Sequence, residues 1–279
     1  MKKISRRSFL AAAGLSVAAL ALTACGGSSA STASSVASSA ASSEAVSTSA
    51  AAGELTTVEA GKLTMATNAA FPPYEMTTDA GEFEGIDIET AQAIADKLGL
   101  ELQIDDMDFD AALLSVQQGK ADIVMAGVTV TDERKAVMDF SDSYATGIQS
   151  IIVPEGSDIA SPDDLAGKKI GTQRGTTGYI YCSDDFGDEN VVAYDDGLTA
   201  VQALNNGQVD AVVIDNAPAQ EFIAANPGLK ILDTSYAEED YAIGMAKGSS
   251  LEDAVNAALK ELKADGTLQS IVDKYITAE

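Results

Sequence analysis

The chain has 279 residues, of which 43 are acidic and 17 basic, and its formal net charge at pH 7 is −26. Such a negative charge disfavours binding to nucleic acid or anionic lipid, because the phosphate groups of both would be repelled. The sequence contains no histidine, which excludes catalysis or metal binding by imidazole.

Residues 1–24 have the pattern of an export signal. Four basic residues precede an apolar stretch, residues 9–22, which is shorter than the roughly 20 residues that a membrane-spanning helix needs. The sequence LTAC at residues 22–25 resembles the lipobox of bacterial lipoproteins, which implies that Cys25 becomes a lipidated N-terminus. The run SRRSFL also resembles a twin-arginine export motif, and an ordinary basic region fits it equally well.

Residues 25–53 are predicted to form a flexible tether. They are nearly all Ser, Ala, Thr and Gly, so they cannot bury enough apolar surface to offset the entropy lost on ordering. With Cys25 lipidated, Cys182 is the one remaining thiol. We therefore expect no intramolecular disulfide and no cysteine-rich zinc site, and we expect Cys182 to be a buried structural residue.

From residue 54 onward, short apolar runs alternate with amphipathic helical patterns, which predicts an α/β fold with largely parallel strands. Helices are expected at 87–98, 109–118, 198–206 and 251–263, the first three ending at Gly99, Gly119 and Gly207. Ser250 and Asp253 predict a capping box for the fourth, and Thr267 is expected to open a last helix. The expected strands are residues 63–66, 100–104, 123–128, 169–172, 191–194, 211–214 and 229–232.

A weak internal repeat divides this part of the chain. Residues 113–127 parallel residues 201–215, with Asp122 matching Asp210, and residues 60–68 echo residues 166–174. Each half is therefore predicted to be a small α/β lobe. Because ligands of open α/β sheets bind beyond the carboxyl ends of the strands, two facing lobes would form a cleft lined by equivalent strand ends.

Arg134 is the first candidate binding residue. It follows the predicted helix N-cap Thr131 and two acids, Asp132 and Glu133, that suit the positive end of a helix, whereas an arginine there does not. Beside the strand end at residues 127–129, its guanidinium is suited to holding a carboxylate or phosphate through two hydrogen bonds. The alternative is a surface arginine paired with Asp132 or Glu133.

Two other places in the sequence could bind charged groups of a ligand. Asp215 ends an apolar strand without an evident partner nearby in sequence, so it either meets a cationic group of a ligand or caps the helix that begins near Pro218. Thr176 and Thr177 stand at a predicted helix N-terminus, which suits an anion. Their loop lacks the lysine of a P-loop and the GxGxxG pattern, so nucleotide binding is disfavoured. A free α-amino acid carries both of the charges that these groups would bind.

Five sequence motifs are similar to those of a known protein family: ATNAAFPPYE (66–75), AGVTVTDER (126–134), MDFSDSY (138–144), GTTG (175–178) and VVID (212–215). They resemble the amino-acid-binding proteins of polar amino acid ABC transporters, family 3 of the solute-binding proteins, and the resemblance extends from residue 54 to residue 279. It implies a two-lobed type II periplasmic-binding-protein fold. Lobe 1 would comprise residues 54–144 and 243–279, lobe 2 residues 149–238, and the hinge strands residues 145–148 and 239–242.

The resemblance also implies roles for single residues. Arg134 would clamp the α-carboxylate of the ligand, assisted by Thr129 and by the backbone of Thr176 and Thr177. Asp215 and the backbone of Gly127 would bind its α-ammonium group. No metal and no cofactor are implied; the implied partners are an ABC permease and, through the lipid on Cys25, the membrane, with the protein acting outside the cytoplasm as a monomer.

The ligand's side chain would be sandwiched between Phe71 and Phe109, which would otherwise be interpreted as core residues. The positions that tune side-chain choice are Asn68, Gln173 and Ile214. Many family members carry aspartate in place of Asn68, and some carry lysine in place of Gln173. We therefore expect a neutral polar ligand such as glutamine, with Glu75, Asp106 or Asp108 as alternative partners for a cationic one.

The sequence disfavours three other functions. The acidic run at 105–110 resembles a calcium loop, but Ala111 and Gln117 replace its required glycine and glutamate. A dehydratase-like enzyme on this fold would use Asp215 or Glu75 as general acid or base; the missing histidine and the zwitterion clamp disfavour it. A tethered amino-acid sensor is disfavoured because no signalling segment is evident.

Overall fold

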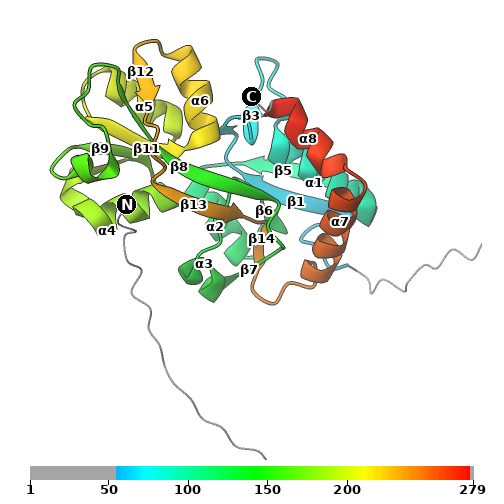
Figure 1. The fold of residues 1–279 in the computed structure, drawn as a ribbon. Helices are drawn as coiled ribbons and strands as arrows, with labels where there is room; N and C mark the ends of the chain where they lie inside the picture. The colour runs from blue at the N-terminus through cyan, green and yellow to red at the C-terminus, as the bar shows by residue number, and fades with distance from the viewer. Residues whose placement is uncertain (1–54, 277–279) are drawn as a thin grey trace, which may run out of the picture. The chain divides into compact units, whose positions relative to one another are not determined.

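The computed structural model describes residues 55–276, so the predicted export signal, Cys25 and tether lie outside the described residues. Two mixed β-sheets organise the described part (Figure 1). In the first sheet, the order is β5-β1-β6-β14-β7, with β1 parallel to β5 and β6 and with β14 antiparallel to β6 and β7. Its strands are β1 (Lys62–Thr67), β5 (Glu101–Asp106), β6 (Ile123–Val124), β7 (Met138–Phe140) and β14 (Gly244–Ala246).

The second sheet has the order β10-β9-β11-β8-β12, and β13 also pairs with β8. Strand β9 is parallel to β10 and β11, whereas β8 is antiparallel to β11, β12 and β13. A small antiparallel sheet is formed by β2 (Ala70–Phe71), β3 (Glu75–Thr77) and β4 (Phe83–Glu84). The second sheet comprises β8 (Ala145–Pro154), β9 (Ile170–Gln173), β10 (Val191–Tyr194), β11 (Ala211–Asp215), β12 (Leu229–Ile231) and β13 (Ala237–Tyr241).

The prediction of largely parallel strands is therefore right only for β1, β5, β6, β9, β10 and β11. Strand β8 enters the second sheet from the first, and β13 leads back to the first sheet. Strand β8 therefore runs antiparallel to β11, β12 and β13. Strands β8 and β13 pair with Gly147 opposite Glu239. The predicted hinge ranges, residues 145–148 and 239–242, contain the start of β8 and the end of β13 (Figure 1).

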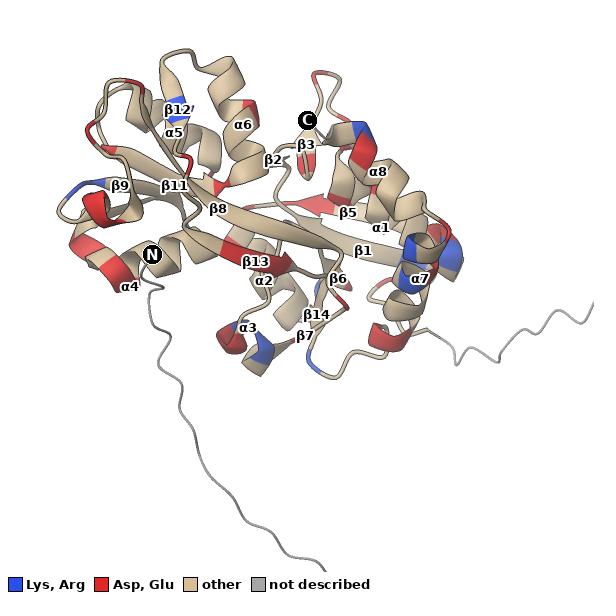
Figure 2. Cartoon of the chain, viewed as in Figure 1, with Lys and Arg blue, Asp and Glu red and all other residues tan. Residues whose placement is uncertain are grey.

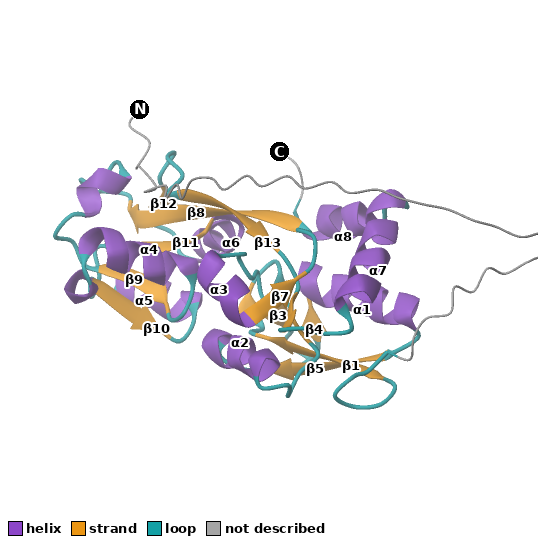
Figure 3. Cartoon of the chain, turned by 90° about the horizontal axis from the view of Figure 1, so that it is seen from below, coloured by secondary structure: helices purple, strands orange, loops and turns teal. Residues whose placement is uncertain are grey.

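Helices cover both faces of each sheet, as the view from below shows (Figure 3). In β1, Leu63 and Met65 pack in the core against helix α1, while Ala66 belongs to the cluster on the side of α2, because neighbouring side chains of a strand face opposite ways. Around the first sheet lie α1 (Ile86–Leu98), α2 (Phe109–Gln117), α3 (Asp132–Val137), α7 (Glu252–Ala264) and α8 (Thr267–Tyr275); around the second lie α4 (Thr177–Phe186), α5 (Gly197–Asn205), α6 (Asn216–Ala225) and the 3-10 helices η1 (Pro162–Leu165) and η2 (Asp188–Asn190).

The helix ends test the sequence patterns individually. Gly99 caps α1 in the left-handed conformation at φ 70°, as predicted, and Thr131 accepts a hydrogen bond from the backbone of Arg134 as the N-cap of α3. The capping box predicted for α7 is wrong. That helix begins one residue later, after Leu251, whose backbone N–H donates to the hydroxyl of Ser249.

The internal repeat has a structural counterpart. The Asp122 carboxylate accepts a 2.8 Å hydrogen bond from the backbone of Thr64 in β1, and the Asp210 carboxylate accepts one of 2.8 Å from Lys169, just before β9. Each aspartate thus ties the start of a central strand to the loop that follows a helix. Cys182 is buried in α4, as expected, and burial raises its pKa to about 12.

Among residues 55–276, no helix is both long and apolar enough to cross a membrane. The same residues contain no group of three or more cysteine, aspartate or glutamate side chains placed to hold a metal ion.

Candidate functional site

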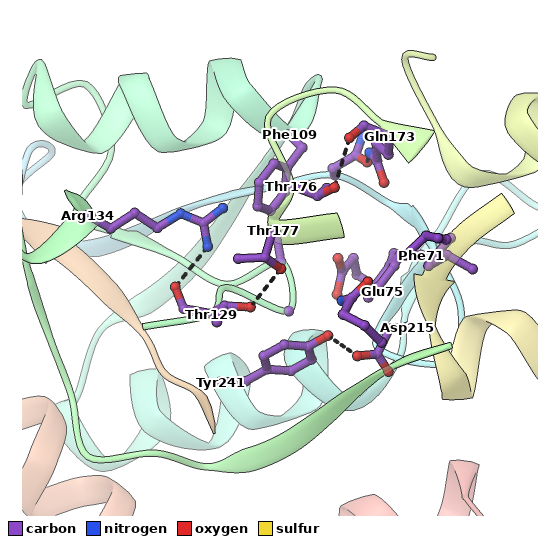
Figure 4. A pocket seen from close by; sticks show the side chains of 16 residues that line it. Phe71, Glu75, Phe109, Thr129, Arg134, Gln173, Thr176, Thr177, Asp215 and Tyr241 are labelled. Atoms are coloured by element: carbon purple, nitrogen blue, oxygen red, sulfur yellow. Dashed lines mark hydrogen bonds between the residues drawn. The ribbon is translucent and has the colours of Figure 1, made fainter. Parts of the chain in front are cut away.

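One pocket brings the predicted site residues together (Figure 4). They reach it from the ends of β1, β9 and β11, from β2, from the loop after β6, and from the starts of α2, α3 and α4. The pocket is also lined by Ile214, by the alternative partner Glu75, and by four residues that the sequence did not point to, Ala126, Gln149, Val213 and Tyr241. All ten predicted residues line it: Asn68, Phe71, Phe109, Gly127, Thr129, Arg134, Gln173, Thr176, Thr177 and Asp215.

Arg134 is buried, with 8% of its surface exposed. Its guanidinium donates to the backbone oxygen of Thr129 at 2.8 Å and to that of Gly175 at 3.1 Å, and lies 5.3 Å from the centre of the Phe109 ring. No carboxylate within residues 55–276 forms an ion pair with it, so the alternative of pairing with Asp132 or Glu133 is wrong. Burial lowers the pKa of Arg134, and the negative charge of Glu239 is the largest effect opposing this.

The start of α4 lies opposite Arg134. The hydroxyl of Thr176 is the N-cap, because it accepts from the backbone N–H of Tyr179, and it donates to the backbone oxygen of Gln173 at 2.8 Å. The first N–H groups of a helix have no partner within the helix, so this end can donate to an anion. Gly175 brings its backbone oxygen to the guanidinium from the same loop.

Asp215 caps α6 and also lines the pocket, so the predicted helix cap is confirmed, whereas its binding of a cationic ligand group stays a prediction. Its carboxylate accepts at 3.4 Å from the backbone of Ala217 in α6, and a short hydrogen bond from the hydroxyl of Tyr241 (Figure 4). Burial raises the pKa of Asp215 to about 7. Tyr241 comes from β13, and no local pattern in the sequence marks it as a partner of a residue 26 positions earlier.

The two aromatic residues come from short elements of the first half. Phe71 lies in β2 and stacks on Tyr74, with ring centres 5.9 Å apart, and Phe109 is the first residue of α2. Gly127 fits between Phe71 and Tyr241. A Cβ at position 127 would lie 3.0 Å from the ring of Phe71 and 3.2 Å from that of Tyr241, so the close approach favours glycine.

Asn68 and Gln173 meet across the pocket. The Gln173 side chain donates to the Asn68 side-chain oxygen at 2.8 Å and to the backbone oxygen of Asp195 at 3.2 Å. The Asn68 amide group donates in turn to the backbone oxygen of Met107. The two amides therefore link the end of β1 to the end of β9 and present uncharged polar groups to the pocket.

Glu75 is the acidic alternative that the structure places in the pocket. It is fully buried, and no described residue donates a hydrogen bond to either of its carboxylate oxygens, whereas the neutral acid can itself donate to Asp87. Burial, followed by the charge of Asp87, raises its pKa well above the usual value, which favours the neutral acid. Asp106 and Asp108 do not line the pocket: Asp106 accepts from the backbone of Ala69, and Asp108 precedes α2.

The strand ends of two β-sheets meet at a pocket that holds a buried guanidinium and a buried carboxylate. This arrangement is typical of proteins that bind small dipolar molecules. The chain belongs to the bacterial extracellular solute-binding proteins, family 3, whose family model matches residues 63–278. This family consists of solute-binding proteins and not of enzymes.

Individual relatives agree with this assignment. The chain is 33% identical over 226 residues to the L-cystine-binding protein TcyJ of Escherichia coli K12, a match that covers 79% of this chain and 85% of the relative. It is 33% identical over 228 residues to the arginine-binding extracellular protein ArtP of Bacillus subtilis, covering 78% and 87%. The arginine-, lysine-, histidine-binding protein ArtJ of Geobacillus stearothermophilus matches in structure with a TM-score of 0.75 and 34% identity, covering 78% and 96%. This likeness confirms the predicted two-lobed α/β fold.

Proposed function

We propose that this protein is the substrate-binding component of an amino acid ABC importer, which captures a free polar L-amino acid between two lobes and delivers it to a membrane permease. The observation that carries the proposal is that Arg134 and Asp215, two buried residues of opposite charge, line the same pocket. The amino acids named for the relatives support it.

In this proposal the ligand's α-carboxylate binds the Arg134 guanidinium and the first N–H groups of α4. Its α-ammonium binds Asp215 and the backbone oxygen of Gly127, and its side chain lies between Phe71 and Phe109. A charge-assisted hydrogen bond contributes about 1.5–3 kcal/mol. A few such bonds at each end can therefore support micromolar affinity, about −8 kcal/mol, after the costs of association.

The side chain of the ligand would meet Asn68, Gln173 and Glu75. Two of these are neutral amides, and the raised pKa of Glu75 favours its uncharged form. These groups support the expectation of an uncharged polar side chain such as that of glutamine. A guanidinium or ammonium side chain would require Glu75 to ionise.

The lobe boundaries are those that the family resemblance implies, and the division of the strands between two sheets supports them. Lobe 1 is taken as residues 54–144 and 243–279 and lobe 2 as residues 149–238, with residues 145–148 of β8 and 239–242 at and after the end of β13 as the hinge. A ligand that bridges Arg134 in lobe 1 and Asp215 in lobe 2 favours the closed arrangement, which the permease would recognise.

We further propose that residues 1–24 direct export and that Cys25 is lipidated, with residues 25–53 linking the lipid to the binding domain. The protein would then act as a monomer held at the outer face of the cell membrane. The composition of the leader supports this proposal.

A thermal-shift screen against the twenty amino acids, cystine and ornithine tests the function. A ligand at 100 times its dissociation constant adds about 2.7 kcal/mol to the free energy of unfolding, so a true ligand should raise the melting temperature clearly. We expect glutamine to respond. If none of the compounds raises the melting temperature, the proposed function is wrong; if arginine responds and glutamine does not, only the expected ligand is wrong.

A further inference from the structure

Glu239 is a buried acid beside the pocket that the proposed function leaves without a role. It is the middle one of three consecutive acids in β13, a strand whose acidic colouring is visible in Figure 2. Because side chains of a strand alternate between its two faces, Glu238 and Asp240 are exposed while Glu239 is 6% exposed. A buried carboxylate requires hydrogen-bond donors, and those of Glu239 come from both halves of the fold.

One oxygen of Glu239 accepts all the hydrogen bonds that this carboxylate makes with described residues. The distances to Oε2 are 3.1 Å from the Thr129 hydroxyl, 2.9 Å from the Thr177 hydroxyl and 3.0 Å from the Gln149 amide nitrogen. Thr129 follows β6 of the first sheet, whereas Thr177 begins α4 and Gln149 lies in β8 of the second sheet. All three donor residues line the pocket, so Glu239, which is not part of the lining, holds these polar side chains of the pocket in place.

These contacts decide what the two threonines can offer a ligand. A hydroxyl has a single hydrogen and two lone pairs. The Glu239 carboxylate is a stronger acceptor than a hydroxyl, and it lies closer to each threonine oxygen, at 3.1 and 2.9 Å, than the two threonine oxygens lie to each other, at 3.5 Å. We therefore assign both hydroxyl hydrogens to Glu239, which leaves the two oxygens with only lone pairs for the pocket. Lone pairs accept hydrogen bonds from an ammonium group, and they cannot donate to a carboxylate.

We propose that Glu239 is a positioning residue for the α-ammonium end of the ligand. It holds the hydroxyl hydrogens of Thr129 and Thr177 away from the pocket, so that both oxygens accept from the ammonium group together with Asp215. This inference rests on the proposed function. It moves the Thr129 side chain from the carboxylate end, where the family resemblance had put it, to the ammonium end, and leaves the carboxylate to Arg134 and the backbone of α4.

A double-mutant cycle tests the inference by calorimetry on the purified protein. The probes are L-glutamine, L-arginine, L-histidine and L-cystine, and the one that binds wild type most tightly is carried forward. Glu239→Met removes the acceptor at similar size, and Thr129→Val with Thr177→Val removes both hydroxyls while keeping the side-chain shape. Circular dichroism melting of every variant checks folding.

We expect Glu239→Met to weaken binding about tenfold or more in the wild-type background, because two charge-assisted hydrogen bonds to the ligand lose their alignment. In the background without the two hydroxyls it should weaken binding by less than about threefold, since the residue acts through them. Equal factors in both backgrounds would overturn the inference. If Glu239→Met does not fold, Glu239→Leu, which also lacks an acceptor, replaces it under the same comparison.

A second measurement separates positioning from a general structural effect. The analogue that lacks the α-amino group, glutaramic acid for glutamine or 5-guanidinopentanoic acid for arginine, competes with the amino acid in each variant. We expect the preference for the amino acid to fall about tenfold in Glu239→Met, whereas a structural defect would weaken both compounds equally. An unchanged preference contradicts the inference alone. If wild type binds none of the four probes, the amino acid that responds in the thermal-shift screen replaces them, and the absence of any responder there contradicts the proposed function and the inference together.

Discussion

Arg134 shows how this protein keeps a buried charge in place without an ion pair. Two backbone oxygens accept from its guanidinium, and the ring of Phe109 lies against it. Backbone oxygens are weaker partners than a carboxylate, so the site retains a strong attraction for an anion. The charge of Glu239 lies near enough to offset part of the cost of burial, yet it forms no ion pair with the guanidinium.

Arg134→Ala should abolish measurable amino-acid binding in calorimetry, because it removes the charge-assisted hydrogen bonds to the carboxylate, about 1.5–3 kcal/mol each. The circular dichroism spectrum and cooperative melting should persist. Arg174→Ala is the matched control, since that arginine is exposed and makes a 3.5 Å surface pair with Asp195 that contributes little. Wild-type affinity in Arg134→Ala would show that the clamp is wrong.

Asp215 predicts a dependence of affinity on pH. Its pKa of about 7 lies above the usual value, so the ligand-free protein carries a proton there at pH 6. An ammonium group favours the carboxylate, so binding releases this proton and affinity should rise with pH, by up to about tenfold per unit, until about pH 7. Calorimetry between pH 5.5 and 8 measures the slope.

Asp215→Asn provides the comparison for this slope, because asparagine caps helices as well as aspartate does. We expect weaker binding that no longer rises with pH. A slope that persists in Asp215→Asn would assign the titration to another group, of which Glu75 is the first candidate.

At the scale of elements, the paired strands β8 and β13 position groups from both sheets. Gly147 in β8 faces Glu239 in β13, and the side chains of Tyr241 and Asp215 pack against it. A Cβ at position 147 would lie 2.5 Å from the Tyr241 ring and 2.6 Å from the Asp215 carboxylate. No residue other than glycine fits this crossing while the Tyr241–Asp215 hydrogen bond stays in place.

Gly147→Ala should therefore weaken amino-acid binding about tenfold and lower the free energy of unfolding by about 1–3 kcal/mol, the usual cost of overpacking. Gly156→Ala, in the turn after β8, is the control, because no atom lies within 4 Å of the added methyl group. Urea unfolding and calorimetry measure the two effects. Equal behaviour of the two variants would mean that the close packing at Gly147 does not support the site.

At the scale of the whole binding domain, side-chain hydrogen bonds join the two proposed lobes around the pocket. Gln173 bonds to Asn68, Arg134 bonds to the backbone of Gly175, and Glu239 joins Thr129 to Thr177. A ligand that bonds to both lobes adds to these contacts, whereas water can replace them when the lobes separate. Ligand binding should therefore shift the population towards the closed arrangement.

Small-angle scattering tests this closure. The radius of gyration of the wild-type protein should decrease when its amino acid is added at saturation, because the hinge closes the cleft. Arg134→Ala, mixed with the same amino acid, should show no decrease. A wild-type radius that does not change on binding would contradict the two-strand hinge.

Local patterns in the sequence were sufficient for the elements that depend on near neighbours. The cap at Thr131, the end of α1 at Gly99 and strands β1, β5, β9, β10 and β11 follow from residues a few positions apart. Arg134 and Asp215 stood out for the same reason, since each conflicts with its immediate surroundings unless a ligand or a helix end meets it. Asn68 and Gln173 lie just beyond predicted strands, at the expected edge of the cleft, whereas Phe71 and Phe109 had no such mark and were found through the family resemblance.

The other features of the fold and the site depend on which distant segments of the chain come into contact. Glu239 meets Thr129 after 110 residues, Gln149 after 90 and Thr177 after 62, so no local pattern predicts their hydrogen bonds. The sequence by itself determined the α/β composition, the helix ends and the two charged groups, because short-range sterics and hydrogen bonding decide these. Only the tertiary structure decided which strands run antiparallel, which acid lines the pocket and which groups the threonine hydroxyls contact, because burial and partnership there are set by the packing of the two sheets.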